Sequence, residues 1–215
     1  MKKVAIGCGV LAVLGLIVLI IVLFAGGSYN RLVRLSQQTD SSWAQVQTDY
    51  QRRMDLIPNL VATVSGAADF EKSTLTQITD ARASVGRVNF SSKSSPQDPA
   101  QLAAFEQAQS QLSSALSRLL VVVERYPDLK SSANFLTLQA QLEGTENRIA
   151  VSRRDFNDAV QKYDTAVKSF PALLYAGALG FHDKPYFSAA PGAETAPKVQ
   201  FDFNKPAPAP APAKP

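Results

Sequence analysis

Cysteine and histidine are nearly absent from this chain of 215 residues, which has one of each. A single residue of each kind excludes a disulfide framework, a Cys/His zinc site and a Cys–His catalytic pair. An excess of one charge is also lacking. Lys2 and Lys3 are two of 22 basic residues, and the 20 that remain are balanced by 18 acidic residues. This balance argues against a nucleic acid as partner.

Recognisable reaction chemistry is missing as well. The sequence has no phosphate-binding loop, no nucleophile–base pair and no cluster with the spacing of metal ligands. We therefore expect a non-enzymatic protein with no catalytic residues, no cofactor and no metal site. An enzyme or metal protein, like a receptor or signalling protein, is a less favoured class.

One long hydrophobic run is present, near the N-terminus. Residues 4–25 carry no charge, and only Gly7, Gly9 and Gly15 among them are not apolar. As a helix this run extends about 33 Å, enough to span a hydrocarbon core of about 30 Å. A cleaved signal peptide is the alternative, but its apolar region is usually about 7–15 residues long. We therefore expect an uncleaved transmembrane helix within residues 1–28, which contacts membrane lipid through residues 4–25.

Charges on both sides of this run bear on its orientation. Lys2 and Lys3 favour a cytoplasmic N-terminus, whereas Arg31 and Arg34 follow the run and argue weakly against that placement. A long domain translocates largely regardless of its charge. We therefore expect a single-pass protein of the bacterial inner membrane, with the rest of the chain on the extracytoplasmic side.

Proline-free stretches with apolar residues at three- and four-residue steps predict an all-α fold. We expect four helices, over residues 29–55, 58–88, 98–126 and 132–170. Asp98 can cap the third helix, with Pro99 in the first helical position and Gln101 completing a capping box. The apolar positions recur at nearly seven residues, which predicts shallow left-handed packing. The predicted core stripe of the last helix comprises Phe135, Leu142, Ile149, Phe156, Val160, Tyr163, Val167 and Phe170.

The connection between the first two helices decides the topology. Residues before a proline avoid the helical region, so the chain should turn or kink at residues 55–58. A turn gives an antiparallel up-down-up-down four-helix bundle. A kink gives one long rod over residues 29–88 with the other two helices beside it. We favour the turn, because the shorter helices could not cover such a rod.

Regular structure declines after Pro171. Residues 172–178 predict a short helix, and spaced aromatic residues then predict an extended strip anchored on the bundle. These aromatic residues are Phe181, Tyr186, Phe187, Phe201 and Phe203. Residues 205–215 alternate proline and alanine, as in a disordered polyproline tail or a ligand for a groove-binding partner. We expect a bundle domain with a C-terminal extension over residues 29–187, and a Pro/Ala-rich tail over residues 188–215.

Charged residues occupy helix positions that the apolar stripes would otherwise fill. Glu71 and Arg82 lie on the second predicted helix, and Glu146 and Arg153 lie on the fourth. A buried charge is costly unless it is paired. We therefore predict a buried polar network in which Glu71 and Glu146 pair with Arg82 and Arg153 and fix the register of the helices. A partner-binding surface and a di-metal site are the alternatives, and the latter lacks the Glu-x-x-His motif.

A second polar group surrounds Pro58. Arg52, Arg53, Asp55 and Asn59 are clustered there. Asp55 can cap the second predicted helix, and the arginines can lie at the C-terminal end of the first, where the helix dipole favours cations. We interpret this corner as structural, with the docking of a partner as the alternative.

Several stretches occur in the order and spacing of a known family. They are residues 29–33 (YNRLV), 52–61 (RRMDLIPNLV), 141–150 (QLEGTENRIA) and 153–157 (RRDFN), with Trp43, Val46, Tyr50, Glu71, Leu75, Ala81, Arg82, Phe170, Pro171, Gly180 and Phe181 at matching positions. Over residues 4–187 the chain thereby resembles the LemA family of bacterial membrane proteins. The resemblance implies an N-terminal membrane helix, an antiparallel four-helix bundle, and no catalytic residues or cofactor. Residues 68–70 (ADF) depart from the family, which often has Tyr-Ala and a histidine there.

Two functions of different kinds fit these features. The first is a membrane-anchored scaffold or adaptor that binds other envelope proteins, as expected from a helical bundle with a flexible tail. The second is a self-assembling protein that organises membrane. Ala5, Cys8, Ala12 and Gly15 place small residues on one face of the membrane helix, where a second copy could pack to form a homo-oligomer.

Overall fold

The computed structural model describes residues 2–66, 70–88 and 94–188, and the side chains of residues 1–13 and 17–25 lie outside that description. The described residues form helices and irregular segments without a strand, which confirms the all-α fold class. The helices are α1 (Lys2–Ser65), α2 (Lys72–Arg87), α3 (Pro99–Val123), α4 (Pro127–Lys130) and α5 (Ala133–Lys168). Two short 3₁₀ helices follow, η1 (Ala172–Leu174) and η2 (Gly177–Leu179).

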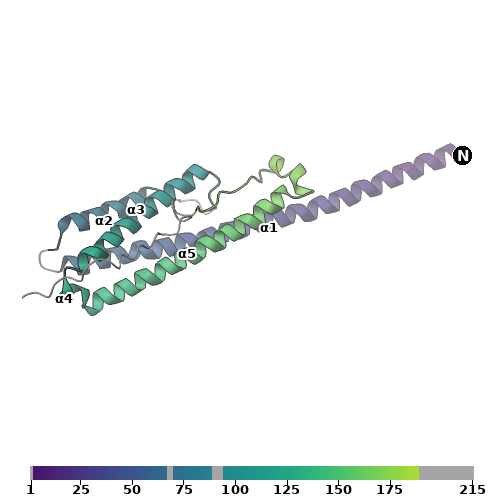
Figure 1. Ribbon diagram of the computed structural model, residues 1–215. Helices are drawn as coiled ribbons and strands as arrows, with labels where there is room; N and C mark the ends of the chain where they lie inside the picture. Colours follow the sequence, from purple (N-terminus) through teal and green to yellow (C-terminus); the bar gives the residue numbers. More distant parts are fainter. Residues whose placement is uncertain (1, 67–69, 89–93, 189–215) are drawn as a thin grey trace, which may run out of the picture.

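α1 and α5 form the most extensive helix pair (Figure 1). They run in opposite directions, and the N-terminal part of α1 continues alone beyond the end of α5. α2 and α3 pack mainly on each other and lie along the far part of α1, while α4 lies at the end away from the N-terminus. The described part of the chain is therefore elongated, with α1 projecting from one end.

α1 continues through Pro58, so the turn predicted at residues 55–58 is wrong. A proline inside a helix costs about 3 kcal/mol, because it removes a backbone hydrogen bond and its ring clashes with the preceding turn. On either side of it, Ile57 and Leu60 are almost fully buried. Each such burial stabilises the fold by about 1.5–3 kcal/mol, which offsets that cost. The chain leaves helical structure after Ser65 instead, and α2 is shorter than predicted.

The predicted starts of the next two long helices are confirmed. Asp98 Oδ1 accepts a hydrogen bond from the Ala100 N–H at 2.8 Å, with Pro99 in the first turn of α3. At the start of α5, Ser132 Oγ accepts from the Phe135 N–H at 3.3 Å. Both caps satisfy backbone donors that the first helical turn leaves free.

The core consists of three apolar clusters along the long axis. The first includes Ile57, Leu112, Leu119 and Phe135, and an aromatic cluster around Trp43 follows it. The third forms where η1 and η2 return to α1. Nearly all of the predicted α5 stripe is buried. Phe170 is the exception, since its side chain is 81% exposed just beyond the end of α5.

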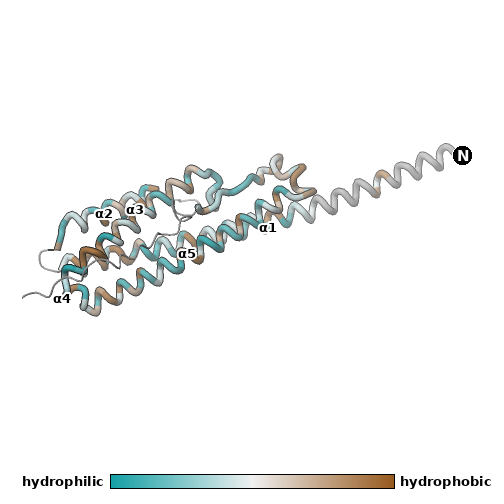
Figure 2. Tube along the Cα trace, viewed as in Figure 1, coloured by the Kyte–Doolittle hydropathy of each residue, from teal (hydrophilic) through white to brown (hydrophobic). Residues whose placement is uncertain are grey.

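Among the described residues, no helical segment combines the length and the hydropathy that a membrane crossing requires. The predicted membrane segment, residues 4–25, belongs to α1, but its side chains lie outside the description except at residues 14–16. The side chains of Ala5, Cys8 and Ala12, three of the four in the predicted small-residue face, also lie outside it. Figure 2 accordingly leaves most of this part of α1 grey.

Candidate functional site

A buried arginine links three helices at the centre of the fold. The Arg53 side chain comes from α1 and is 1% exposed. Its Nη1 donates to Glu146 Oε1 on α5 at 2.5 Å and to Ser113 Oγ on α3 at 3.0 Å. Its Nη2 donates to Gln109 Oε1 on α3. We call these four residues the Arg53 cluster, which satisfies most of the guanidinium donors in a buried setting.

Tyr50 packs beside this cluster on the same helix. The Arg53 guanidinium carbon lies 5.1 Å from the Tyr50 ring centroid, and the Phe105 ring meets Tyr50 edge-on at 4.9 Å. Burial raises the pKa of the Tyr50 hydroxyl, and the positive charges of Arg153 and Arg53 partly offset that rise. The negative face of the ring attracts the arginine, so Tyr50 holds the guanidinium in place.

A cleft of about 1000 Å³ opens beside the Arg53 cluster. All four long helices and Ser188 contribute to its lining, and hydrogen-bonding side chains predominate. Besides Tyr50, Arg53, Gln109, Ser113 and Ser188, the polar residues of this polar cleft are Gln77, Asp80, Ser84, Glu106, Gln107, Ser110, Gln111, Ser114, Arg118 and Arg153. Its volume matches that of sites that hold small ligands.

The buried network predicted among Glu71, Arg82, Glu146 and Arg153 does not form. Glu71 precedes α2 and pairs with Arg125 at 2.6 Å, and both side chains are well exposed. Arg82 is exposed and reaches the backbone carbonyl of Met54 at 3.5 Å. The break after Ser65 changes the register of the second predicted helix, which moves both residues off the core face.

Glu146 and Arg153 each form an ion pair, but with other residues than predicted. Glu146 is half exposed and pairs with Arg53. Arg153 pairs with Glu106 on α3 at 2.8 Å, with both side chains partly buried. Glu146 and Arg153 therefore do join α5 to other helices, but their partners are not the charged residues predicted from the apolar stripes.

Only one member of the predicted Pro58 corner is buried. Arg53 lies in the core, whereas Arg52, Asp55 and Asn59 are exposed. Asp55 accepts a hydrogen bond from Gln51 at 2.7 Å on its own helix. Because α1 is continuous there, no helix end exists for Asp55 to cap or for the arginines to neutralise.

Residues 181–188 form an extended strap that returns along the helices. The Asn157 side chain binds the Phe187 backbone twice, donating to the carbonyl at 3.0 Å and accepting from the N–H at 2.9 Å. The Phe187 ring stacks on Trp43 with centroids 6.0 Å apart, and Arg153 lies 4.5 Å above it. This confirms the predicted anchoring at Phe187. Tyr186 is 42% exposed, and Phe201 and Phe203 lie outside the described residues.

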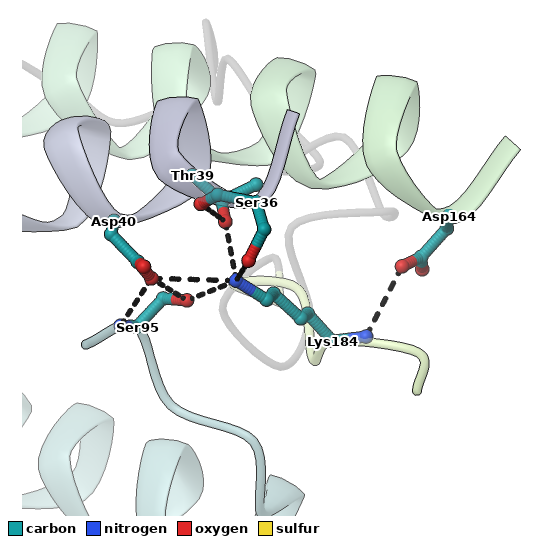
Figure 3. Close-up of polar contacts among 6 residues, drawn as sticks. All are labelled: Ser36, Thr39, Asp40, Ser95, Asp164 and Lys184. Atoms are coloured by element: carbon teal, nitrogen blue, oxygen red, sulfur yellow. Dashed lines mark hydrogen bonds and ion pairs between the residues drawn. The ribbon is translucent and has the colours of Figure 1, made fainter. Parts of the chain in front are cut away.

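Lys184 fastens the strap to three other segments (Figure 3). Its backbone N–H donates to Asp164 Oδ1 on α5 at 3.1 Å. Its buried ammonium nitrogen Nζ approaches four oxygens, namely Thr39 Oγ1 at 2.5 Å, Ser95 Oγ at 2.8 Å, Ser36 Oγ at 3.3 Å and Asp40 Oδ1 at 3.4 Å. Burial lowers the pKa of Lys184, against the opposing effect of Asp40. Lys184 thereby joins α1, α5 and the α2–α3 connection.

Tyr163 on α5 lies beneath the Lys184 ammonium group, which faces its ring. This tyrosine should make the stability of the fold sensitive to alkaline pH. Burial, together with the charges of Asp164, Asp183 and Asp40, raises the pKa of Tyr163 to about 12. An unfolded tyrosine titrates near pH 10, so between about pH 10 and 12 the unfolded chain loses a proton that the folded chain keeps. The free energy of unfolding therefore falls as pH rises through this window.

We expect a Tyr163→Phe variant to lose less stability than the wild type across that window, as measured by urea unfolding at several alkaline pH values. Tyr29→Phe, which removes the hydroxyl of an exposed ring, is the matched control. An unchanged pH dependence in Tyr163→Phe would contradict this assignment.

Within the part of the chain that the structure describes, no set of three His, Cys, Asp or Glu side chains is placed to hold a metal ion. His182 is an exposed residue of the strap. The polar contacts described above join helix to helix and strap to helix. Fold and site together define an elongated all-helical protein closed by a C-terminal strap.

The chain belongs to the LemA family, whose family model matches residues 42–201. It is similar to the magnetosome proteins MamQ 1 and MamQ 2 of Paramagnetospirillum magneticum, at 27% identity over 185 residues, which covers 78% of this chain and 67% of each relative. It is also similar to protein LemA of Metamycoplasma hominis, at 24% identity over 164 residues, which covers 76% of this chain and 70% of that protein. Membership of the LemA family and similarity to the MamQ proteins support the interpretation of this chain as a non-enzymatic, membrane-associated helical protein.

Proposed function

We propose that the protein is a scaffold or adaptor for other envelope proteins, anchored in the bacterial inner membrane by a single helix at residues 4–25. The uncharged length of this run supports the anchor. The proposal divides the chain into an anchor (1–28), a bundle domain with its extension (29–187) and a tail (188–215). In the bundle, α1, α2, α3 and α5 run up-down-up-down, on the extracytoplasmic side.

The polar cleft is the observation that carries the adaptor role. Glutamine and serine side chains such as Gln107, Ser110 and Gln111 line it and can both donate and accept hydrogen bonds. Asn157 carries the same amide group as glutamine, and its side chain binds the extended backbone of the strap at Phe187. We propose that a segment of a partner protein binds in the polar cleft through its backbone.

Site-specific photo-crosslinking in intact cells tests this proposal. A photoreactive residue at Gln111, in the polar cleft, should capture a discrete partner that mass spectrometry identifies. The same residue at Lys162, exposed on α5 and absent from the cleft lining, is the matched control. Capture of the same proteins at both positions, or of none at Gln111, would contradict the adaptor role.

Self-assembly that organises membrane is the second candidate. The small residues Ala5, Cys8, Ala12 and Gly15 support it, since such a face allows close packing of membrane helices. Two of the similar proteins, MamQ 1 and MamQ 2, are named magnetosome proteins. These names are compatible with a membrane-organising role for this chain. Oxidative crosslinking through Cys8 in membranes should then yield dimers, and a strictly monomeric species in native mass spectrometry would end this candidate.

A further inference from the structure

Large apolar side chains are exposed together in the segment that joins α5 to the strap. Phe170 is 81% exposed, Leu174 75%, Leu173 63% and Leu179 54%. We call these four residues the 170–179 patch. Exposed apolar residues elsewhere on α3 and α5, such as Val121, stand singly. Since exposed apolar side chains gathered in one segment mark a candidate interaction site, this patch calls for a partner.

The side chains of this segment are sorted in an unusual way. Ala172 and Ala176 are buried against Leu32 of α1, whereas Leu173 and Leu174 between them face outward. In water, burying the leucines and exposing the alanines would be favoured, because burial of apolar area is the main driving force. The outward leucines therefore suit a surrounding that is itself apolar.

The patch lies next to the predicted membrane segment. Phe170 lines a cleft together with Gly27 and Ser28 of α1. Gly27 and Ser28 follow Ala25, the last residue of the apolar run, by about 3–5 Å along the helix axis. The headgroup region on each side of a bilayer is about 5–8 Å thick. With the run in the hydrocarbon core, Phe170 would lie at headgroup depth.

The figures show the same placement. In Figure 1, η1 and η2 lie beside α1, on the side of the fold from which the N-terminal part of α1 projects. Figure 2 colours part of this segment brown next to α1. A bilayer around residues 4–25 would thus face η1 and η2 and not the α4 end.

Two arginines of α1 lie on the side of the patch that faces the predicted membrane segment. Arg31 lines the same cleft as Phe170, and Arg34 is exposed one turn further along α1. Lys168, at the end of α5, is exposed and pairs with Asp183 at 2.7 Å. Because Asp183 balances Lys168, the positive charge beside the patch comes from Arg31 and Arg34, and basic residues beside an apolar surface favour anionic phospholipid headgroups.

We propose that the 170–179 patch is a second membrane contact, whose apolar side chains insert at the boundary between headgroups and acyl chains of the bilayer that holds residues 4–25. The inference rests on the proposed anchor. The inserted leucines and Phe170 fix the fold against the membrane surface, while Arg31 and Arg34 contact anionic headgroups. The occupant is the lipid surface, and a second copy of the chain is an outcome that the test separates.

Fluorescence quenching in vesicles tests the contact with the full chain. In a Cys8→Ser background, Leu174→Cys carries an environment-sensitive dye in vesicles of phosphatidylcholine and phosphatidylglycerol with spin-labelled lipid. We expect a blue shift and strong quenching at position 174. The matched control is Val121→Cys near the end of α3, also exposed but at the α4 end, where we expect neither change. Both sites are exposed, so the label leaves the core intact.

The same dye on the native Cys8 separates this inference from the anchor. Quenching at Cys8 without quenching at position 174 overturns the patch contact and leaves the anchor standing. Quenching at position 174 without quenching at Cys8 supports a surface contact and overturns the anchor, and no quenching at either overturns both. A blue shift at position 174 in lipid-free detergent that grows with protein concentration overturns the lipid assignment in favour of a second copy.

Discussion

Replacing Arg53 with methionine is expected to lower the free energy of unfolding by about 2–4 kcal/mol. The substitution removes a buried guanidinium that binds three side chains on two other helices. Gln109 is 4% exposed and loses its partner inside the core. Glu146 is half exposed and can be hydrated again, which keeps the loss below that of a fully buried pair. Urea unfolding followed by circular dichroism measures the change.

The neighbouring arginine provides the control. Arg52 is exposed on the same turn of α1, and Arg52→Met should change stability by less than about 0.5 kcal/mol. Glu146→Gln keeps a hydrogen-bond acceptor for Arg53 and should have an intermediate effect. Equal stability of the Arg53 and Arg52 variants would show that the Arg53 cluster is not a structural link.

Replacing Phe187 with alanine is expected to cost about 3–5 kcal/mol and to detach the strap from the helices. Phe187 is 6% exposed, and its ring packs against Trp43 and Phe156. Trp43 is the single tryptophan of the chain, so the tryptophan fluorescence reports the surroundings of this one indole. We expect a red-shifted emission together with the loss of stability, because water would reach the indole where Phe187 packed.

Replacing the adjacent residue, Tyr186, shows whether the effect comes from the Phe187 ring or from any substitution in the strap. Tyr186 is 42% exposed, and Tyr186→Ala should leave the Trp43 emission as in the wild type. Its loss of stability should stay well below that of Phe187→Ala, because the Tyr186 side chain is much less buried. An unshifted Trp43 spectrum in Phe187→Ala would mean that the strap is held by Lys184 and Asn157 without the ring.

Local signals predicted where α3 and α5 begin, and tertiary packing decided what these signals missed. Asp98 with Pro99 and Ser132 are caps whose chemistry is complete within a few residues, so the starts of α3 and α5 could be predicted. Pro58 is also a local signal, but its effect depends on what surrounds it. The burial of Ile57 and Leu60 outweighs the cost of the proline, and that burial depends on helices distant in the sequence.

The polar contacts were harder to predict, for two physical reasons. A long side chain such as Arg53 extends across the core, so the position of its Cα within a stripe does not identify its partner. Lys184 was missed altogether, because it lies on an irregular segment without periodicity. The residues that bind its ammonium group come from α1 and from the α2–α3 connection, and only the folded chain brings them together.

The continuity of α1 has a mechanical consequence if residues 4–25 lie in a bilayer as proposed. No hinge loop separates that run from the core, so any tilt of the spanning part is passed on to the body of the protein. Residues 26–57 extend about 48 Å, and a tilt of about 20° would displace their far end sideways by about 16 Å. Bilayer thickness and the contact of the 170–179 patch, which both act on this tilt, would thereby influence how far from the membrane normal the α4 end lies.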